Sequence, residues 1–229
     1  MSVPVQMILV PKGAEHQAIC RGLRGVLYPP TVFPVPVGVA PLAQYLDSLH
    51  QAGCFYPGQT VLMMGLCGGL SPQLAVGDAV LYQECVAARD ALDAKSYSCD
   101  RALTETLQAK LGNQTTLVKA VTSDRVISAI SDKQKLFQQF HTEVVDMEGT
   151  TAIERLTQFG VAVATLRVVS DDCHHPIPNL ENVFSPSGSL RPVPLAISMA
   201  RQPIAAYYLI RGSTQGLKIL QNLTVSLFN

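Results

Sequence analysis

The chain has 229 residues and a formal net charge of zero, and only 15% of its residues are charged. A chain of this length can form one α/β domain with a substantial core, so we expect a single domain over residues 1–229. The balanced charge argues against nucleic acid as a partner, because nucleic-acid-binding domains carry a clustered basic excess. The apolar fraction of 48% indicates a buried sheet with a homo-oligomer interface, a dimer being favoured, or else an apolar substrate pocket.

The amino-terminal residues and the cysteines indicate the cellular compartment in which the protein is expected. Residues 1–10 contain no basic region and no long apolar core, so they do not resemble a signal peptide. No apolar run approaches the roughly 20 residues that span a bilayer. The cysteines are widely scattered and form no Cys-x-x-Cys pair, which is typical of reduced thiols. We therefore expect a cytoplasmic protein without a transmembrane segment; its six cysteines are Cys20, Cys54, Cys67, Cys85, Cys99 and Cys173.

Apolar runs of strand length alternate with segments of helical spacing along most of the chain. In chain order the pattern predicts a strand at 3–10, a helix at 15–23, a strand at 31–39, a helix at 41–52, strands at 60–64 and 79–87, a helix at 100–111, a strand at 115–121, a helix at 132–140, a strand at 143–145, a helix at 148–159, a strand at 162–170 and helices at 193–201 and 204–223. Such alternation favours a three-layer α/β/α fold around a central mixed, mostly parallel sheet.

Some elements and loops have a clear local cause. Pro34 and Pro36 place the strand at 31–39 at an edge of the sheet, because proline cannot donate to a strand ladder. Asp100 is suited to cap the helix that follows it. Residues 173–194 are rich in Pro, Ser and Asn and are expected to form a long loop. Loops of that length in compact domains are often functional lids.

A glycine-rich segment, 65–70, follows the predicted strand at 60–64. A turn of this kind lets the backbone approach a ligand and point N–H groups at it, although a tight turn without a ligand is an equal alternative. The spacing is not Gly-x-Gly-x-x-Gly, and no Lys-Ser or Lys-Thr pair follows. The segment is therefore not a P-loop, and a Rossmann-type dehydrogenase is disfavoured.

Asp146 and Glu148 lie two residues apart where a predicted strand becomes a helix, with Met147 between them. An acid at a helix start is usually a cap, and this explanation suits Asp146. Glu148 could complement the helix dipole. Alternatively, Glu148 could accept hydrogen bonds from sugar hydroxyls at the carboxyl edge of the sheet, where open α/β folds bind ligands.

Asp171 and Asp172 follow the strand at 162–170. Adjacent carboxylates repel each other, so one of them can act as a general acid near neutral pH, while a capped loop is the alternative. Arg167 on the same strand is a candidate buried partner for an acid. Glu15 follows the first strand, where it could equally be an ordinary acid in a first helical turn. The neighbouring His174 and His175 have no third ligand close by, so we expect no metal site.

Four stretches then occur in the order found in one family. They are Gly-Ala-Glu at 13–15, Gly-Leu-Cys-Gly-Gly-Leu at 65–70 with Val-Gly-Asp at 76–78, Val-Asp-Met-Glu at 145–148 and Arg-Val-Val-Ser-Asp at 167–171. With these motifs the chain resembles the nucleoside phosphorylase/nucleosidase superfamily, which contains purine nucleoside phosphorylase and methylthioadenosine/S-adenosylhomocysteine nucleosidase. Shorter segments resemble its hopanoid-associated phosphorylase-like branch, namely 123–127, the helix with Lys135, 176–178 and 201–203.

The resemblance implies roles for particular residues. Asp171 matches the general acid that protonates or hydrogen-bonds purine N7, and Glu15 matches the acid that positions or activates water. Glu148 matches the acid that binds ribose hydroxyls, and Met147 the residue that lies against the sugar. Gly68 and Gly69 match the loop whose backbone faces the ligand, and the base-contacting positions fall at 125–127. The expected substrate-binding set is Glu148, Met147, Gly68, Gly69, Cys67, Arg125, Val126, Ile127 and Ser170.

The chain also departs from the family pattern. Leu66 stands where the nucleosidases have a serine, and Cys67 where a small residue is common, so the nucleophile side of the site is more apolar. The arginine-rich phosphate elements of the larger phosphorylases are not obvious, and Arg21, Arg24 and Arg89 are only candidates. Inorganic phosphate thus stays a possible co-substrate, and no other cofactor is expected.

These points together predict an enzyme that cleaves the N-glycosidic bond of a purine nucleoside, an adenosine type being favoured, with glycosyl transfer to phosphate or water. The apolar composition and the long loop at 173–194 suggest a substrate with a bulky, lipid-like 5′ substituent. The alternative is a nucleoside-binding protein of the same fold that has lost turnover, for which Leu66 is the main support. Three acids at the matched positions, Glu15, Glu148 and Asp171, argue against that alternative.

Overall fold

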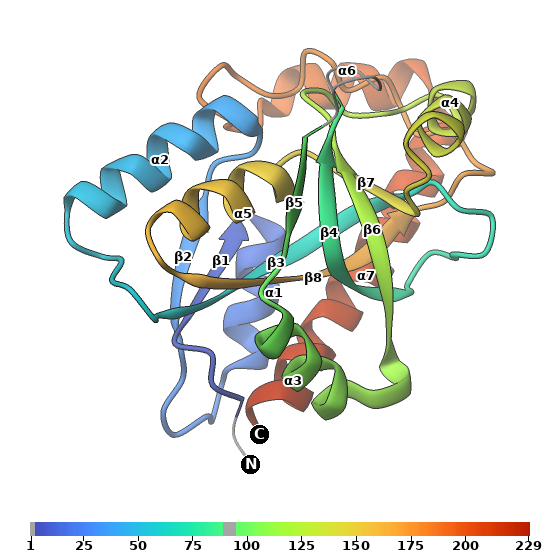
Figure 1. The fold of residues 1–229 in the computed structure, drawn as a ribbon. Helices are drawn as coiled ribbons and strands as arrows, with labels where there is room; N and C mark the ends of the chain where they lie inside the picture. The colour runs from blue at the N-terminus through green and yellow to red at the C-terminus, as the bar shows by residue number, and fades with distance from the viewer. Residues whose placement is uncertain (1–2, 89–94) are drawn as a thin grey trace.

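The computed structural model describes residues 3–88 and 95–229 (Figure 1). Its helices and strands alternate as the sequence predicts. In chain order they are β1 (Met7–Pro11), α1 (Ala14–Gly22), β2 (Thr31–Val35), α2 (Val39–Gln51), β3 (Thr60–Gly69), β4 (Ala79–Ala87), β5 (Ser96–Ser98), α3 (Arg101–Leu111), β6 (Thr115–Thr122), α4 (Ile130–Phe140), β7 (Val144–Asp146), α5 (Gly149–Gln158), β8 (Ala162–Asp171), α6 (Pro192–Arg201) and α7 (Pro203–Phe228). None of these helices is both long and apolar enough to cross a bilayer within the described ranges.

The described strands form one sheet in the order β2-β1-β3-β7-β6-β4-β5, and β8 pairs with both β3 and β4. Five pairings are parallel, namely β1 with β2 and β3, β3 with β8, and β6 with β4 and β7. The pairings of β3 with β7, and of β4 with β5 and β8, are antiparallel. The sheet is therefore mixed and mostly parallel, as predicted, and the proline-containing β2 lies at its edge.

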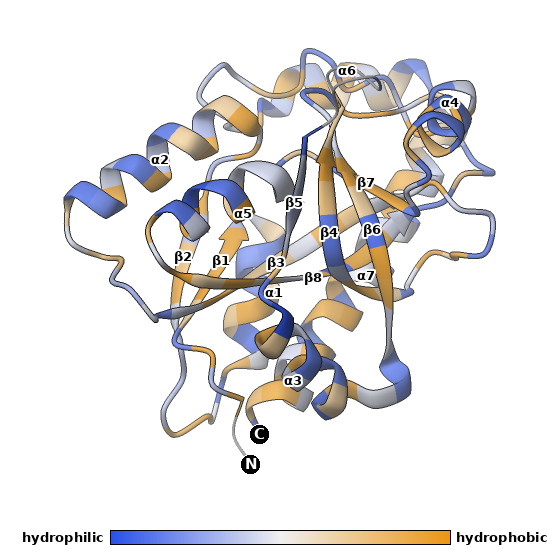
Figure 2. Cartoon of the chain, viewed as in Figure 1, coloured by the Kyte–Doolittle hydropathy of each residue, from blue (hydrophilic) through white to orange (hydrophobic). Residues whose placement is uncertain are grey.

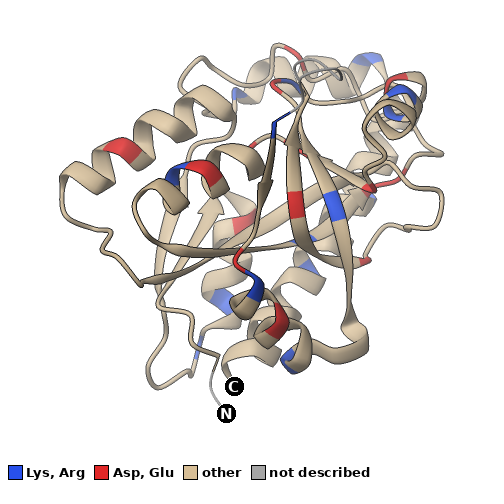
Figure 3. Cartoon of the chain, viewed as in Figure 1, with Lys and Arg blue, Asp and Glu red and all other residues tan. Residues whose placement is uncertain are grey.

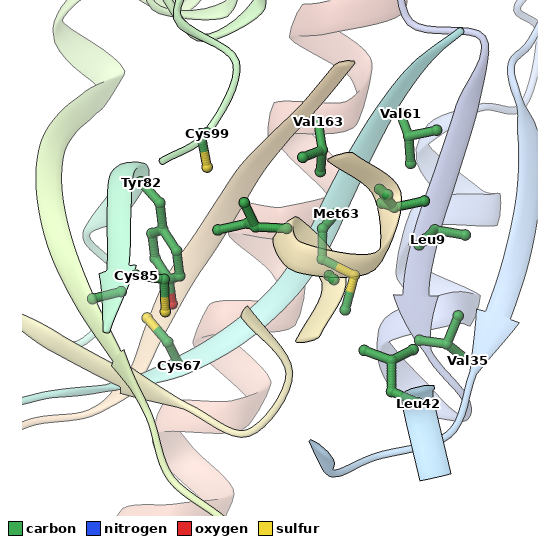
Figure 4. Close-up of a cluster of buried hydrophobic side chains, with 14 of the residues drawn as sticks. Leu9, Val35, Leu42, Val61, Met63, Cys67, Tyr82, Cys85, Cys99 and Val163 are labelled. Atoms are coloured by element: carbon green, nitrogen blue, oxygen red, sulfur yellow. The ribbon is translucent and has the colours of Figure 1, made fainter. Parts of the chain in front are cut away.

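Apolar side chains cover both faces of the sheet, which explains the continuous apolar runs in the sequence (Figure 2). Along β3, Val61 and Met63 join the cluster beneath α2 and α5, whereas Leu62 and Met64 join the cluster against α1, α3 and α7. Figure 4 shows the first cluster, with the Cys67 and Tyr82 side chains beside each other at one end. Helices on both faces complete the predicted three-layer α/β/α architecture.

The prediction that the strand at 60–64 ends in a glycine-rich turn is wrong. Strand β3 continues to Gly69, because it keeps parallel partners on β8 from Thr60 as far as Gly68. Local glycine content predicts a turn, and the neighbouring strand that overrides it is a hundred residues away in sequence. Strand β5 was not expected at all, and α7 runs to Phe228 rather than ending at 223. Asp100 caps α3 as predicted, accepting from the Leu103 N–H at 2.8 Å.

Helix α7 packs directly against the end of β8, and a glycine makes this approach possible. A Cβ at Gly212 would overlap the carbonyl oxygen of Ser170, and one at Gly216 would lie 2.9 Å from the Leu66 side chain. Glycine therefore allows the helix and strand backbones to come closer than any other residue would. The contact fixes the end of β8, where Ser170 and Asp171 lie, against a long helix.

Candidate active site

A cavity of about 200 Å³ lies where the ends of β1, β3, β7 and β8 meet. Ten of the eleven residues predicted for the site line it, and Gly69 does not. Gly69 instead faces β8, because a Cβ there would lie 3.2 Å from the Val169 side chain. Residues as far apart in sequence as Glu15 and Asp171 thus reach one cavity. The predicted residues that line it are Glu15, Cys67, Gly68, Arg125, Val126, Ile127, Met147, Glu148, Ser170 and Asp171.

Arg167 is the electrostatic centre of this cavity. Its side chain is fully buried, and its Nη2 lies 3.2 Å from Asp146 Oδ2 and 3.2 Å from Glu148 Oε2. Its Nη1 donates to the Leu66 carbonyl at 3.4 Å. Burial lowers the pKa of Arg167, but Asp146 and Glu148 raise it by more, so the guanidinium stays charged. The prediction that Arg167 is buried is confirmed, but its partners are Asp146 and Glu148 rather than the acids at the end of its own strand.

Gly65 is required by the position of this arginine. A Cβ at residue 65 would overlap Arg167 Nη1 and would lie 2.8 Å from Glu15 Oε1. Any side chain at this position would therefore push apart the guanidinium and the carboxylate that face each other across β3. The glycine of the Gly-Leu-Cys-Gly-Gly-Leu motif thus makes room for charged groups of the site rather than for a turn.

Glu148 is held rigidly at the start of α5. Its Oε2 pairs with Arg167, and its Oε1 accepts from the Gly38 N–H at 3.0 Å. Gly38 has a φ of 101°, which favours glycine, and it lies just before α2. Burial raises the pKa of Glu148, and Arg167 opposes this effect. Because each carboxylate oxygen has a second lone pair, Glu148 can still accept hydrogen bonds from a ligand in the cavity.

Asp146 supports the site and also caps α5. Its Oδ1 accepts from the Gly149 N–H at 3.1 Å and from the Thr122 hydroxyl at 2.7 Å. The capping explanation from the sequence is therefore correct, although the burial of Asp146 and its pairing with Arg167 were not foreseen. Met147, between the two acids, lines the cavity.

Glu15 projects from the first turn of α1 into the cavity. Its Oε1 accepts from the Leu66 N–H at 2.7 Å. Burial raises the pKa of Glu15 to about 7, against the opposing effects of the Leu66 N–H and Arg167. A carboxyl group with this pKa is ready to take a proton near neutral pH, as a general base must. The apolar side chain of Leu66 does not interrupt this contact, because the donor is the backbone.

Asp171 has two polar partners at the end of β8. The fully buried Lys133 Nζ contacts Asp171 Oδ2 and donates to the Asp172 carbonyl at 2.5 Å. The Ser170 hydroxyl donates to Asp171 Oδ1 at 2.9 Å and lies 3.2 Å from the Cys67 carbonyl. Lys133 comes from α4, and nothing in the sequence marked it, because a lysine in a helix is usually exposed. Asp171 therefore forms an ion pair at the cavity wall rather than standing as an isolated acid.

The neighbouring Asp172 has a structural role. Its Oδ1 accepts from the N–H groups of His174 and His175, each at 2.9 Å, and it lies 3.0 Å from His175 Nδ1. Burial raises the pKa of Asp172, but these contacts lower it by more. The loop-cap explanation is thus correct for Asp172. Within residues 3–88 and 95–229, no three His, Cys, Asp or Glu side chains gather as a metal site requires.

Several candidates prove peripheral or inert. Arg21 and Arg24 are exposed and do not line the cavity, and Arg89 lies outside the described residues. Arg125 lines the cavity, but its side chain is 47% exposed and its Nη2 lies 3.1 Å from Asp132 Oδ2. Burial raises the pKa of Cys67 far above its ordinary value, so its thiol is a neutral part of the wall.

Some lining residues carry no sequence signal. Ile177, Leu180 and Phe184 come from the long segment between β8 and α6, which lies over the cavity as the loop prediction suggested, and Leu209 comes from α7. All are apolar residues in stretches without a motif. Their side chains form an apolar part of the cavity wall.

An acid-lined cavity at the strand ends of a three-layer α/β/α fold is typical of enzymes that act on small polar molecules. The chain belongs to the phosphorylase superfamily, whose family model, described as "Phosphorylase superfamily", matches residues 35–184. This confirms the predicted superfamily and the prediction of an enzyme that cleaves nucleosides. No match was found among curated protein sequences.

Solved structures share the fold. Futalosine hydrolase of Helicobacter pylori, in mutant form, is 16% identical with a TM-score of 0.67, over 95% of this chain and 96% of its own. The 5′-methylthioadenosine/S-adenosyl homocysteine nucleosidase of Helicobacter pylori is 18% identical with a TM-score of 0.67, over 97% and 98%. The nucleosidase of the same description from Campylobacter jejuni is 12% identical with a TM-score of 0.65, over 96% and 99%.

Proposed function

We propose that the chain hydrolyses the N-glycosidic bond of a purine nucleoside of the adenosine type. The observation that carries the choice of water is Glu15, a cavity acid whose pKa is raised to about 7. Water loses a proton to Glu15 as its oxygen attacks C1′ of the sugar. The bond from C1′ to N9 breaks through an oxocarbenium-like state, and the purine leaves with a proton on N7.

Phosphate is the less favoured nucleophile. A phosphate ion needs positive charge at its site, which arginine supplies in bidentate form. Arg167 is already paired with Asp146 and Glu148, and Arg21 and Arg24 lie away from the cavity. Arg125 is the remaining cation among the lining residues that the structure describes, and it pairs with Asp132.

The other acids have separate tasks in this proposal. Glu148, fixed by Arg167 and Gly38, accepts hydrogen bonds from the ribose hydroxyls, and Met147 lies against the sugar. Asp171 faces N7 of the base. An ionised carboxylate cannot donate a proton by itself, so the proton that reaches N7 passes from the Lys133 ammonium through Asp171.

A second cavity of about 620 Å³ suggests where a large 5′ substituent lies. It shares Arg125, Val126 and Ile177 with the first cavity and has a mainly apolar lining that includes Pro203 and Ile204. An apolar chain on the 5′ carbon of the sugar would bury its surface there. This supports the substrate class expected from the composition.

Product analysis tests the proposal directly. Purified protein is incubated with adenosine, inosine, methylthioadenosine and an adenosine bearing a 5′ alkyl chain, with and without phosphate. We expect free base and free sugar at rates that phosphate does not change, with the 5′-alkyl compound the best substrate. Ribose 1-phosphate as product would make phosphate the nucleophile. No base from any compound would contradict the enzymatic proposal, and rapid cleavage of methylthioadenosine alone would contradict the substrate class.

Glu15→Gln should remove the base without changing the size of the side chain. In the unmodified protein, kcat/KM should rise with pH through about 7, because only the ionised carboxylate can accept the proton. In the variant, kcat/KM at pH 8 should fall roughly 100-fold, and the rise near pH 7 should disappear. Glu105→Gln, at an exposed position on α3, is the control. An unchanged pH profile in Glu15→Gln would show that Glu15 is not the base.

Lys133 should act as a positioning and proton-supplying residue. Lys133→Met should lower kcat about 100-fold with little change in KM, because the apolar side chain keeps the volume but supplies no proton. Lys133→Arg should keep the positive charge beside Asp171 but should not recover kcat, because a guanidinium does not release its proton. Lys135→Met is the matched control, two residues along the same helix, with a side chain that is 75% exposed. Equal kcat values in Lys133→Met and Lys135→Met would exclude the proton route.

A further inference from the structure

Helix α6 exposes apolar residues where a helix of a globular protein usually exposes polar ones. Val193, Ala196, Ile197 and Ala200 are all exposed and follow helical spacing along one side. Its polar residue Ser198 turns inward and donates to the Asn179 carbonyl at 2.5 Å. No residue of α6 is fully buried. The helix therefore lies on the protein with its apolar side facing outward.

The first turns of α7 extend this surface. Ile204 is 73% exposed, Tyr207 58% and Ile210 54%, and Leu190, just before α6, is 52% exposed. We call the exposed side chains of Leu190, Val193, Ile197, Ile204, Tyr207 and Ile210 the α6–α7 face. Apolar segments of both helices appear in orange in Figure 2. Contiguous exposed apolar patches of this kind mark contacts with a partner or a membrane.

The chain segment that carries this face has charges of one sign, whereas the acids Asp132 and Glu181 lie nearby on the wall of the 620 Å³ cavity. From residue 182 to the carboxyl terminus the chain has no Asp or Glu, although the whole chain is neutral. Its charged side chains there are Arg191, Arg201, Arg211 and Lys218. The three arginines are exposed next to the apolar residues, and in Figure 3 the α7 ribbon carries blue segments but no red ones. The α6–α7 face thus combines apolar side chains with a positive edge.

This combination favours an anionic membrane surface as the occupant. A second copy of the chain packed face to face would bring like-charged arginines together, which is unfavourable. Anionic phospholipids instead attract each arginine, while the apolar side chains and Tyr207 enter the interface. Tyrosine is enriched at such interfaces because its ring is apolar and its hydroxyl polar.

We propose that the α6–α7 face docks the protein on anionic phospholipid membranes. The opening of the 620 Å³ cavity, which Pro203 and Ile204 line, then lies beside the lipid surface. An apolar molecule can pass from the bilayer into the cavity without crossing water. Docking itself does not depend on the proposed reaction, and it is measured without any nucleoside.

Vesicle flotation tests the proposal on the full chain. Vesicles of phosphatidylcholine alone are compared with vesicles that also contain phosphatidylglycerol, at low and high salt. We expect binding to the anionic vesicles, weakened by salt, and little binding to phosphatidylcholine alone. Ile197→Ser and Ile204→Ser should each reduce binding about tenfold, and Arg201→Gln about fivefold. No binding to anionic vesicles would overturn the proposal.

Two control variants at exposed positions outside the α6–α7 face test whether any loss of vesicle binding is specific to that face. Leu27→Ser changes a residue that is 82% exposed in the loop between α1 and β2, and Arg101→Gln one on α3 whose side chain is 91% exposed. Neither should change vesicle binding, and the far-ultraviolet circular dichroism of every variant should match that of the unmodified protein. Sedimentation velocity without vesicles measures the oligomeric state, and so tests whether a second copy of the chain occupies the α6–α7 face. If Ile197→Ser and Ile204→Ser dissociate an oligomer while vesicle binding is unchanged, the face is an interface between copies and the proposal fails.

Discussion

Asp171→Asn should lower kcat roughly 1,000-fold, because general acid catalysis contributes between about 100-fold and 10,000-fold. Asparagine keeps the shape of the side chain, and its carbonyl can still accept from Lys133, whereas its amide group takes the place of the oxygen that accepts from Ser170. Its amide can hydrogen-bond purine N7 but cannot pass a proton to it. The barrier to departure of the base therefore rises, whereas the affinity for a nucleoside analogue should stay within a fewfold of the original value. Single-turnover release of base and calorimetric titration with the analogue measure the two quantities.

Asp172→Asn is the control for this substitution. The two acids are adjacent, but Asp172 does not line the 200 Å³ cavity, and it caps the turn at His174 and His175. Asparagine can make the same acceptor contacts, so kcat should change less than about threefold. Turnover that survives in Asp171→Asn but falls in Asp172→Asn would mean that the acid is assigned to the wrong residue.

Strand ends indicate the candidate acids, and the resemblance to the family then selects Glu15, Glu148 and Asp171, because the strand-end pattern alone also fits caps and ordinary first-turn acids. Glu15, Glu148 and Asp171 each follow an apolar run of strand length, and the ends of such runs gather at one edge in α/β folds. The family motifs then predict that the three acids belong to one site, and this prediction needs no knowledge of any side-chain contact. The same reasoning failed at 65–70, where glycines predict a turn and the ladder with β8 keeps the chain extended.

The partners of these acids could not be predicted in the same way. Lys133 reaches Asp171 only because α4 packs over the end of β8, and this depends on tertiary geometry. The apolar wall formed by Ile177, Leu180 and Phe184 belongs to a loop without periodicity, so no pattern identifies its inward residues. Arg167 lies in an apolar strand, which marks it as buried, but the strand does not indicate how many acids surround it.

The number of acids around Arg167 determines what it contributes to stability. Asp146 and Glu148 are buried to 1% and 5% side-chain exposure, and Arg167 to 0%. Two buried carboxylates repel each other and would be poorly solvated without a cation between them. Burial raises the pKa of Glu148, and Arg167 acts to lower it. The guanidinium thus opposes the effect of burial and favours the charged form of Glu148, which is the form that the proposed sugar acceptor needs.

Arg167→Met should therefore lower the free energy of unfolding by about 3–5 kcal/mol near pH 8, because it leaves two buried carboxylates without a cation between them. The loss should shrink as the pH falls. A carboxyl group whose folded-state pKa is raised destabilises the protein as the pH rises through that pKa, and it becomes neutral at lower pH. Without Arg167 the pKa of Glu148 rises further, so the difference from the unmodified protein should be larger at pH 8 than at pH 5.5. Urea unfolding at the two pH values measures it.

Two further variants make the reason for the loss testable. Arg155→Met removes an arginine whose side chain is 36% exposed and lies 3.7 Å from Asp47, and it should cost less than about 1 kcal/mol at either pH. Adding Glu148→Gln to Arg167→Met removes one of the two buried carboxylates that have lost their cation, and it should restore part of the stability at pH 8. If Arg167→Met is as mild as Arg155→Met, or if its effect is the same at both pH values, the buried acids are not held by Arg167. A large loss that grows with pH and is relieved by Glu148→Gln would instead identify Arg167 as the cation that lets a charged acid remain buried at the proposed sugar position.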